Sequence, residues 1–185
     1  EAIDELKEKE FKDLYADENK DQENKVYVKE VQIDTDFETL FPDDYINNIT
    51  ERLNLYTKLN EVKTREELEQ YKSELEDRFG ALPVQAIDLL DSLKLKWHAE
   101  KLGLEKIVLK QKQMVGYVIS DQDSAFYQSQ SFRDVLSSVQ QNAAEFVLKE
   151  KKTRNGLRLI INFGKVQSIQ QALEKIKSLK QNIMA

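Results

Sequence analysis

The amino-acid sequence predicts an α+β fold: an N-terminal helical region with a helical hairpin, then a ββαββα antiparallel sheet with helices on one face. Before Gly103 most apolar residues recur at the spacing of helix turns, whereas after it they form short β-branched runs. Two of these runs are joined by Asn155-Gly156, a dipeptide typical of tight hairpin turns. Strands and helices in this order favour a small sheet with helices packed against one side.

The helical hairpin begins at a recognisable capping box. Thr64 is followed three residues later by Glu67, a pair that satisfies the free N–H groups at a helix start. A single apolar stripe comes next, formed by Leu68, Tyr71, Leu75 and Phe79. We expect Gly80 to end this helix in the left-handed conformation, and Pro83 to open the second helix in its first turn.

The other elements are assigned from the period of their apolar residues. The second helix of the hairpin is expected to run from Pro83 to Leu102, to stop at Gly103, and to bury Ile87, Leu90, Leu93 and Trp97. A strand is predicted over residues 26–33, and a helix that begins at Pro42 is predicted to reach about residue 61. Beyond Gly103 we expect strands at 106–110, 114–119, 146–148 and 157–163, a helix that begins at Ser131, and a last helix capped by Ser168 with Gln171.

The domain organisation is predicted from the loss of apolar periodicity near the N-terminus. Residues 2–15 read as a helix and residues 15–25 as an acidic linker, so that 26–185 form a single α+β domain. The chain begins at Glu1 rather than Met, which suggests a piece of a longer protein.

The composition of the chain indicates the cellular compartment in which it works and the charge of the partners that it could bind. The chain of 185 residues has no cysteine, no signal-peptide pattern and no apolar run near the roughly 20 residues that span a bilayer, so we expect a cytoplasmic protein without a membrane partner. The net charge of −6 is unevenly distributed: residues 1–100 hold 27 acidic and 14 basic side chains, and residues 101–185 hold 7 and 14. This polarity suggests partners of opposite sign on two faces, or attraction within the domain, although most charged residues are expected simply to be solvated.

Residue patterns for catalysis, cofactors or metals are weak throughout. The five glycines are too far apart to form a nucleotide-binding loop. His98 is the only histidine, and Asp121 with Asp123 begins a calcium-loop pattern that lacks the required glycine and glutamate. We therefore expect no catalytic residue, no cofactor, no metal and no small-molecule substrate.

Two charged clusters remain as candidate interaction surfaces. Glu67, Gln70, Glu74 and Asp77 fall opposite the apolar stripe of the first hairpin helix, where they form a docking surface or a solvated face rather than a catalytic carboxylate pair. A basic cluster lies in the C-terminal half and consists of Lys149, Lys151, Lys152 and Arg154 with Lys110, Lys112 and Arg158. We expect no aromatic residue among these basic side chains, which argues against nucleic-acid binding. Nucleic-acid binding by the basic C-terminal half is therefore kept as the alternative function, behind protein docking.

Several short motifs together resemble the C-terminal domain of bacterial transcription-repair coupling factors. They are Phe41-Pro42-Asp43-Asp44-Tyr45-Ile46, Arg52-Leu53 with Tyr56, Glu74-Leu75, Asp77-Arg78-Phe79-Gly80 and Leu82-Pro83. The resemblance is good from Val26 to Gly103 and extends further only in the order of elements. It implies a non-catalytic regulatory domain of an ATP-dependent DNA translocase, which removes stalled RNA polymerase from lesions and recruits nucleotide excision repair.

The resemblance also implies a partner and a set of contact residues. In that family the domain packs against the N-terminal module that binds UvrA, masks it, and restrains the motor in an autoinhibited state. Carried over to this chain, the contact residues are Glu74, Asp77 and Arg78, while Glu76 is expected nearer the buried side of its helix. Residues 1–25 would then be either the end of the preceding motor domain or an ordinary helical extension.

Overall fold

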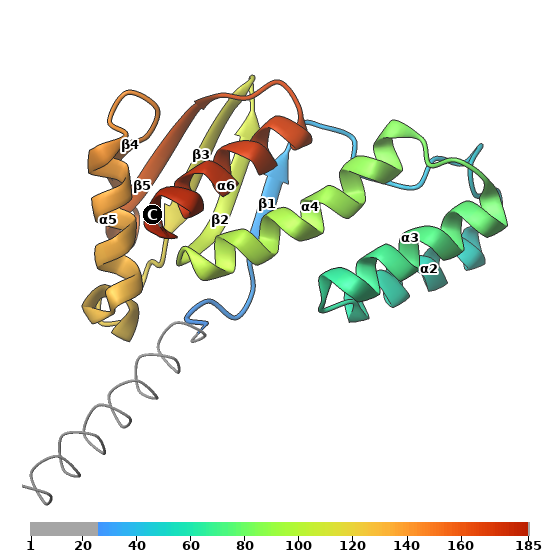
Figure 1. Cartoon of the computed structure of the whole chain (residues 1–185), viewed down its shortest axis with the longest axis horizontal. Coiled ribbons are helices and arrows are strands. Elements are labelled where there is room, and N and C mark those ends of the chain that lie inside the picture. The colour runs from blue at the N-terminus through green and yellow to red at the C-terminus, as the bar shows by residue number, and fades with distance from the viewer. Residues whose placement is uncertain (1–25, 185) are drawn as a thin grey trace, which may run out of the picture.

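A computed structural model describes residues 26–184 of the chain and contains one mixed sheet flanked by helices (Figure 1). The α-helices are α2 (Ile49–Glu61), α3 (Arg65–Phe79), α4 (Val84–Lys101), α5 (Gln130–Gln141) and α6 (Ile169–Met184), with a short 3-10 helix η1 (Ala125–Gln128). The strands are β1 (Gln32–Thr35), β2 (Leu104–Lys110), β3 (Gln113–Val118), β4 (Val147–Thr153) and β5 (Gly156–Lys165).

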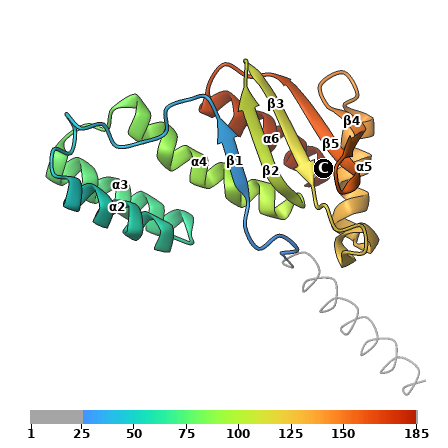
Figure 2. The same cartoon turned by 180° about the vertical axis from the view of Figure 1, so that it is seen from behind.

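The five strands lie in the order β1-β2-β3-β5-β4. The pairs β2–β3, β3–β5 and β5–β4 are antiparallel, whereas β1 is parallel to β2, with Ile33 beside Ile107. Helices α4, α5 and α6 lie on one side of the sheet, and the view from behind shows strands in front (Figures 1 and 2). The predicted α+β class, with helices on one face of the sheet, is confirmed; the parallel β1 makes the sheet mixed rather than purely antiparallel.

The chain buries two apolar cores. The first lies between the sheet and its helices, where the inward residues of the strands meet α4, α5 and α6; its members include Leu95, Ala99, Ile107, Met114, Phe126, Phe146, Ile161, Phe163 and Ile176. The second lies among the helices at the other end, and it contains Phe41, Ile46, Leu55, Leu59, Leu68, Tyr71, Leu75, Ala86 and Leu90. Helix α4 contributes to both cores, so it joins the helical end to the sheet.

The predicted cap of α3 at Thr64 is confirmed, but the Glu67 side chain accepts from the N–H of Lys63 rather than from that of Thr64 as in a standard capping box. The Thr64 hydroxyl accepts a hydrogen bond from the Glu67 N–H at 3.2 Å, and the Glu67 carboxylate accepts one from the Lys63 N–H at 2.8 Å. Gly80 ends the helix with φ +85° and ψ −168°, a conformation reserved for glycine that differs from the expected left-handed helical one. Pro83 lies one residue before α4 as its N-cap rather than inside its first turn.

Several predicted boundaries are wrong. The strand expected over 26–33 begins at Gln32, because the apolar residues before it fill the sheet core without joining the ladder of hydrogen bonds. Pro42 opens an isolated turn, and the helix after it starts at Ile49, where the Asn48 side chain accepts from the Glu51 N–H. The other corrections are that α5 is capped by Ser129 rather than starting at Ser131, and that β4 covers Val147–Thr153 rather than 146–148. The predictions for residues 1–25 lie outside the described residues.

A substitution at Gly103 should destabilise the domain strongly. This residue has φ +72°, and a Cβ atom there would overlap the ring of buried Phe126. We expect Gly103→Ala to lower the free energy of unfolding by at least about 2 kcal/mol, measured by urea denaturation. Gly164→Ala is the matched control, because φ is +82° but the nearest atom is the flexible end of Lys175 at 3.7 Å. Equal losses in the two variants would contradict the packing argument.

A buried hydroxyl ties α3 to α2. The Tyr71 hydroxyl donates to the Leu55 carbonyl at 2.8 Å inside the helical core. Tyr71→Phe should therefore lower the free energy of unfolding by about 1 kcal/mol. Tyr45→Phe removes a more exposed hydroxyl, which donates to the Gly80 carbonyl at 2.9 Å. In thermal unfolding, Tyr45→Phe should therefore lower the free energy of unfolding by less than Tyr71→Phe does. The reverse order would show that Tyr71 does not hold the two helices together.

Candidate docking surface on the helical end

Helix α3 places its charged residues outward because its opposite side fills the helical core. Leu68, Tyr71 and Leu75 are buried, which fixes the rotation of the helix. The three predicted docking residues, Glu74, Asp77 and Arg78, are consequently all exposed. We call Glu67, Gln70, Glu74 and Asp77 of α3 the acidic face.

Two of the three docking residues have partners within the domain. The Glu74 carboxylate accepts from the Lys58 ammonium of α2 at 2.6 Å. Arg78 forms an ion pair with Glu51 of α2, and its guanidinium lies 4.8 Å from the centre of the Phe79 ring. Within residues 26–184 Asp77 has no ion-pair partner. Both pairs are solvent-accessible, so they hold α2 and α3 together only weakly and leave the charges available for exchange.

The acidic face borders a shallow pocket between α2 and α3. Its volume is about 300 Å³, and its lining consists of Lys58, Glu61, Val62, Glu67, Gln70, Tyr71 and Glu74. Carboxylates stand on both helices around it, with Lys58 as the single cation of the lining. Such a surface suits a basic or amide-bearing side chain from a partner protein.

Two tyrosines of the helical end, Tyr71 and Tyr45, serve as hydrogen-bond donors. Burial raises the pKa of the Tyr71 hydroxyl far above its usual range, and burial with the nearby Glu76 carboxylate raises the pKa of the Tyr45 hydroxyl. Both hydroxyls therefore remain protonated at neutral pH and keep their bonds to backbone carbonyls. Glu76 itself is exposed, and its carboxylate lies close enough to Tyr45 to act on that hydroxyl.

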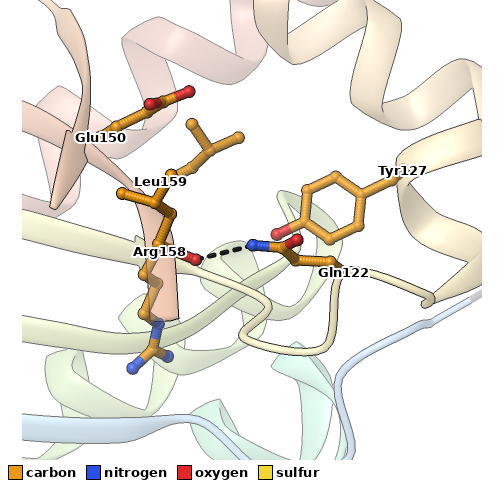
Figure 3. Close-up of a pocket in the computed structure, with 6 residues that line it drawn as sticks. Gln122, Tyr127, Glu150, Arg158 and Leu159 are labelled. Atoms are coloured by element: carbon orange, nitrogen blue, oxygen red, sulfur yellow. Dashed lines mark hydrogen bonds between the residues drawn. The ribbon is translucent and has the colours of Figure 1, made fainter. Parts of the chain in front are cut away.

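A second pocket, of about 330 Å³, lies between the loop before α5 and the β4–β5 hairpin (Figure 3). Gln122 donates to the Leu157 carbonyl at 2.9 Å, and the Tyr127 hydroxyl donates to the Ile119 carbonyl. Burial raises the pKa of Tyr127, which keeps that hydroxyl protonated. These polar groups are engaged in holding the loop on the sheet, and the side chain of Arg158 points away from Glu150 and Leu159 (Figure 3).

The part of the chain that the structure describes contains no group of three or more His, Cys, Asp or Glu side chains able to hold a metal. Burial raises the pKa of the Asp88 and Glu100 carboxyls on α4, and the Asp91 charge adds to this effect at Asp88. Neither carboxyl group belongs to the acidic face.

Over residues 26–184, no helix is both long and apolar enough to cross a bilayer.

The structure corrects the description of the basic cluster. An aromatic residue does lie among the basic side chains: the Tyr117 ring centre is 5.1 Å from the Arg158 guanidinium, 5.3 Å from Lys151 Nζ and 5.9 Å from Lys106 Nζ. Sequence reasoning missed this grouping because its residues come from four strands, which meet only through the β2-β3-β5-β4 pairing. The sequence did contain one signal for the position of Tyr117. Along β3, Met114, Gly116 and Val118 alternate with Val115 and Tyr117, which places Tyr117 on the side of the sheet away from the buried residues.

Comparisons with known proteins agree on one family. The TRCF domain model matches residues 35–129, which are 95 of the 185 residues. The transcription-repair-coupling factor of Escherichia coli is 40% identical over 79 residues, covering 43% of this chain and 7% of the relative. That of one Staphylococcus epidermidis strain is 29% identical over 141 residues, covering 71% of this chain and 12% of the relative. The chain thus spans about a tenth of the length of these relatives.

A solved structure, the C-terminal domain of a transcription-repair coupling factor, shares the fold. It superposes with a TM-score of 0.62 at 16% identity and covers 84% of this chain and 92% of that one. The resemblance to this family on sequence motifs is therefore confirmed by family model, relatives and fold. Since the family model matches more than half of its length, the chain belongs to the TRCF domain family.

Proposed function

We propose that this chain is the C-terminal domain of a transcription-repair coupling factor and that it acts by docking rather than by catalysis. Its partner is the N-terminal UvrA-binding module of the same protein, which it masks in a resting, autoinhibited state. The contact is made by Glu74, Asp77 and Arg78. The observation that carries the proposal is that Asp77 is exposed and has no ion-pair partner within residues 26–184. Its neighbours on the same helix, Glu74 and Arg78, are held only by exposed ion pairs with α2.

The charges of this surface suit a contact that can be released. Exposed ion pairs contribute about 0–1 kcal/mol each, because water and salt screen them. Docking would replace the ion pairs Glu74–Lys58 and Arg78–Glu51 by ion pairs with the partner module. When the two modules separate, the original pairs form again, so undocking costs little free energy. A tether within one protein raises the effective concentration of the partner, which lets several weak pairs hold the closed state.

The parent protein supplies the activity that this domain restrains. We propose an ATP-dependent DNA translocase that acts in the cytoplasm on stalled RNA polymerase, with UvrA recruited for nucleotide excision repair once the mask is removed. Residues 26–185 form the regulatory domain in this proposal. The names of the relatives support the assignment of the parent.

Charge reversal on the acidic face should open the full-length protein. Glu74→Lys with Asp77→Lys places two repulsive charges in the contact without touching the core, so the domain should stay folded and lose at most about 1 kcal/mol of stability from the broken Glu74–Lys58 pair. If the two reversals together remove about 1–2 kcal/mol, the ratio of open to closed protein rises by about 5–30-fold. We expect higher resting ATPase activity and tighter UvrA binding, measured on the full-length protein.

Glu69→Lys is the matched control for this experiment. Glu69 lies on the same helix and also faces a lysine, Lys94 at 3.9 Å, but it points toward α4 rather than outward with Asp77. It should leave ATPase activity and UvrA binding at their resting values. The masking role would be excluded if the double variant on the acidic face stayed at those values too.

A further inference from the structure

We infer that the uncovered face of the sheet binds the phosphate backbone of single-stranded nucleic acid. This surface lies opposite helices α4, α5 and α6, and none of the described residues places a helix over it (Figure 2). It is separate from the acidic face, and the inference does not depend on the docking proposed above. We call it the open sheet face.

The residues of the open sheet face follow from strand alternation. Ile107, Met114, Val118 and Ile161 are buried toward the helices, so the residues between them point the other way. The register places one such row across four strands, with Lys106 beside Tyr117, Tyr117 beside Ile160, and Ile160 beside Lys149. A second row contains Val108, Val115, Asn162 and Val147.

Three cations surround one aromatic ring on this face. The Arg158 guanidinium, Lys151 Nζ and Lys106 Nζ lie 5.1, 5.3 and 5.9 Å from the centre of the Tyr117 ring. Lys151 Nζ also donates to the Tyr117 hydroxyl at 3.0 Å. The ring attracts the cations electrostatically and holds them together at a spacing that would otherwise be repulsive. They form a preorganised site for an anion.

The charges on the open sheet face are not balanced. Its cations include Lys106, Lys110, Lys149, Lys151 and Arg158. Asp34 pairs with Lys110 at 2.8 Å and Glu105 pairs with Arg158 at 2.9 Å. Within residues 26–184, Lys106, Lys149 and Lys151 have no carboxylate within ion-pair distance. This excess of positive charge stands out on a chain with a net charge of −6.

The arrangement fits a flexible nucleic-acid strand better than an acidic peptide. Strands lie about 4.8 Å apart, so Lys106 on β2 and Lys149 on β4 are separated by roughly 14 Å, which is long enough to reach two phosphates of one strand that are not adjacent. Between them are the half-buried Tyr117, Ile160 and Val115, which offer an aromatic and apolar floor for bases. Charge with an aromatic platform is how proteins bind single strands without reading their sequence.

Binding of a labelled oligothymidylate of about 16 nucleotides, near the upper end of the site size of one small domain, tests the inference. We expect the whole chain to raise the anisotropy of the label at low salt and to lose affinity as salt increases. Lys106→Gln with Lys151→Gln should reduce the slope of log K against log salt by about 1.4, since each phosphate contact on a single strand contributes about 0.7. Tyr117→Leu should weaken binding further while leaving the net charge unchanged.

Lys101→Gln with Lys177→Gln is the matched control. Both lysines are exposed on α4 and α6, on the opposite side of the sheet, and their removal changes the net charge by the same amount. The control should bind like the unmodified chain. The inference is overturned if the unmodified chain does not bind, if the control weakens binding equally, if duplex of the same length binds more tightly, or if polyglutamate displaces the oligonucleotide at equal charge concentration.

Discussion

The structure depends on a single helix that is apolar on more than one side. The first half of α4 places Ala86 and Leu90 in the helical core, and its second half places Leu95 and Ala99 in the sheet core. A helix with one apolar stripe would serve only one of these cores. Because α4 completes both, the acidic face of α3 is held in a set orientation relative to the sheet, and neither end of the domain is complete without the other.

This arrangement separates charge along the domain. The helical end presents Glu67, Glu74 and Asp77, whereas the sheet end presents Lys106, Lys149 and Lys151 on its uncovered face. At physiological salt the Debye length is about 8 Å, so surfaces at opposite ends of α4 act nearly independently on their surroundings. The two proposed contacts can therefore coexist: a protein docks at the helical end while a nucleic-acid strand lies on the sheet.

Sequence reasoning succeeded where a local pattern determined the structure. The capping box at Thr64 and the stripe after it set the register of α3, which is why the outward position of Asp77 was predictable. It failed where contacts distant in sequence decide. The Arg78–Glu51 pair spans 27 residues, β1 joins β2 across three intervening helices, and Tyr117 meets Arg158 only through strand pairing. A polar turn between the strands at 106–110 and 114–119 was expected and is present, but its positive φ values of +53° at Gln111 and +59° at Lys112 were not predictable, because neither residue is a glycine.

The most direct test of the docking account is an NMR titration of the ¹⁵N-labelled chain with the separately expressed N-terminal module of the same protein. The account predicts salt-sensitive shifts of amide signals in Glu74 to Arg78 and in the α2 residues that pair with them, Glu51 and Lys58. Shifts confined to α6 or to the open sheet face, or no shifts at all at low salt, would contradict it.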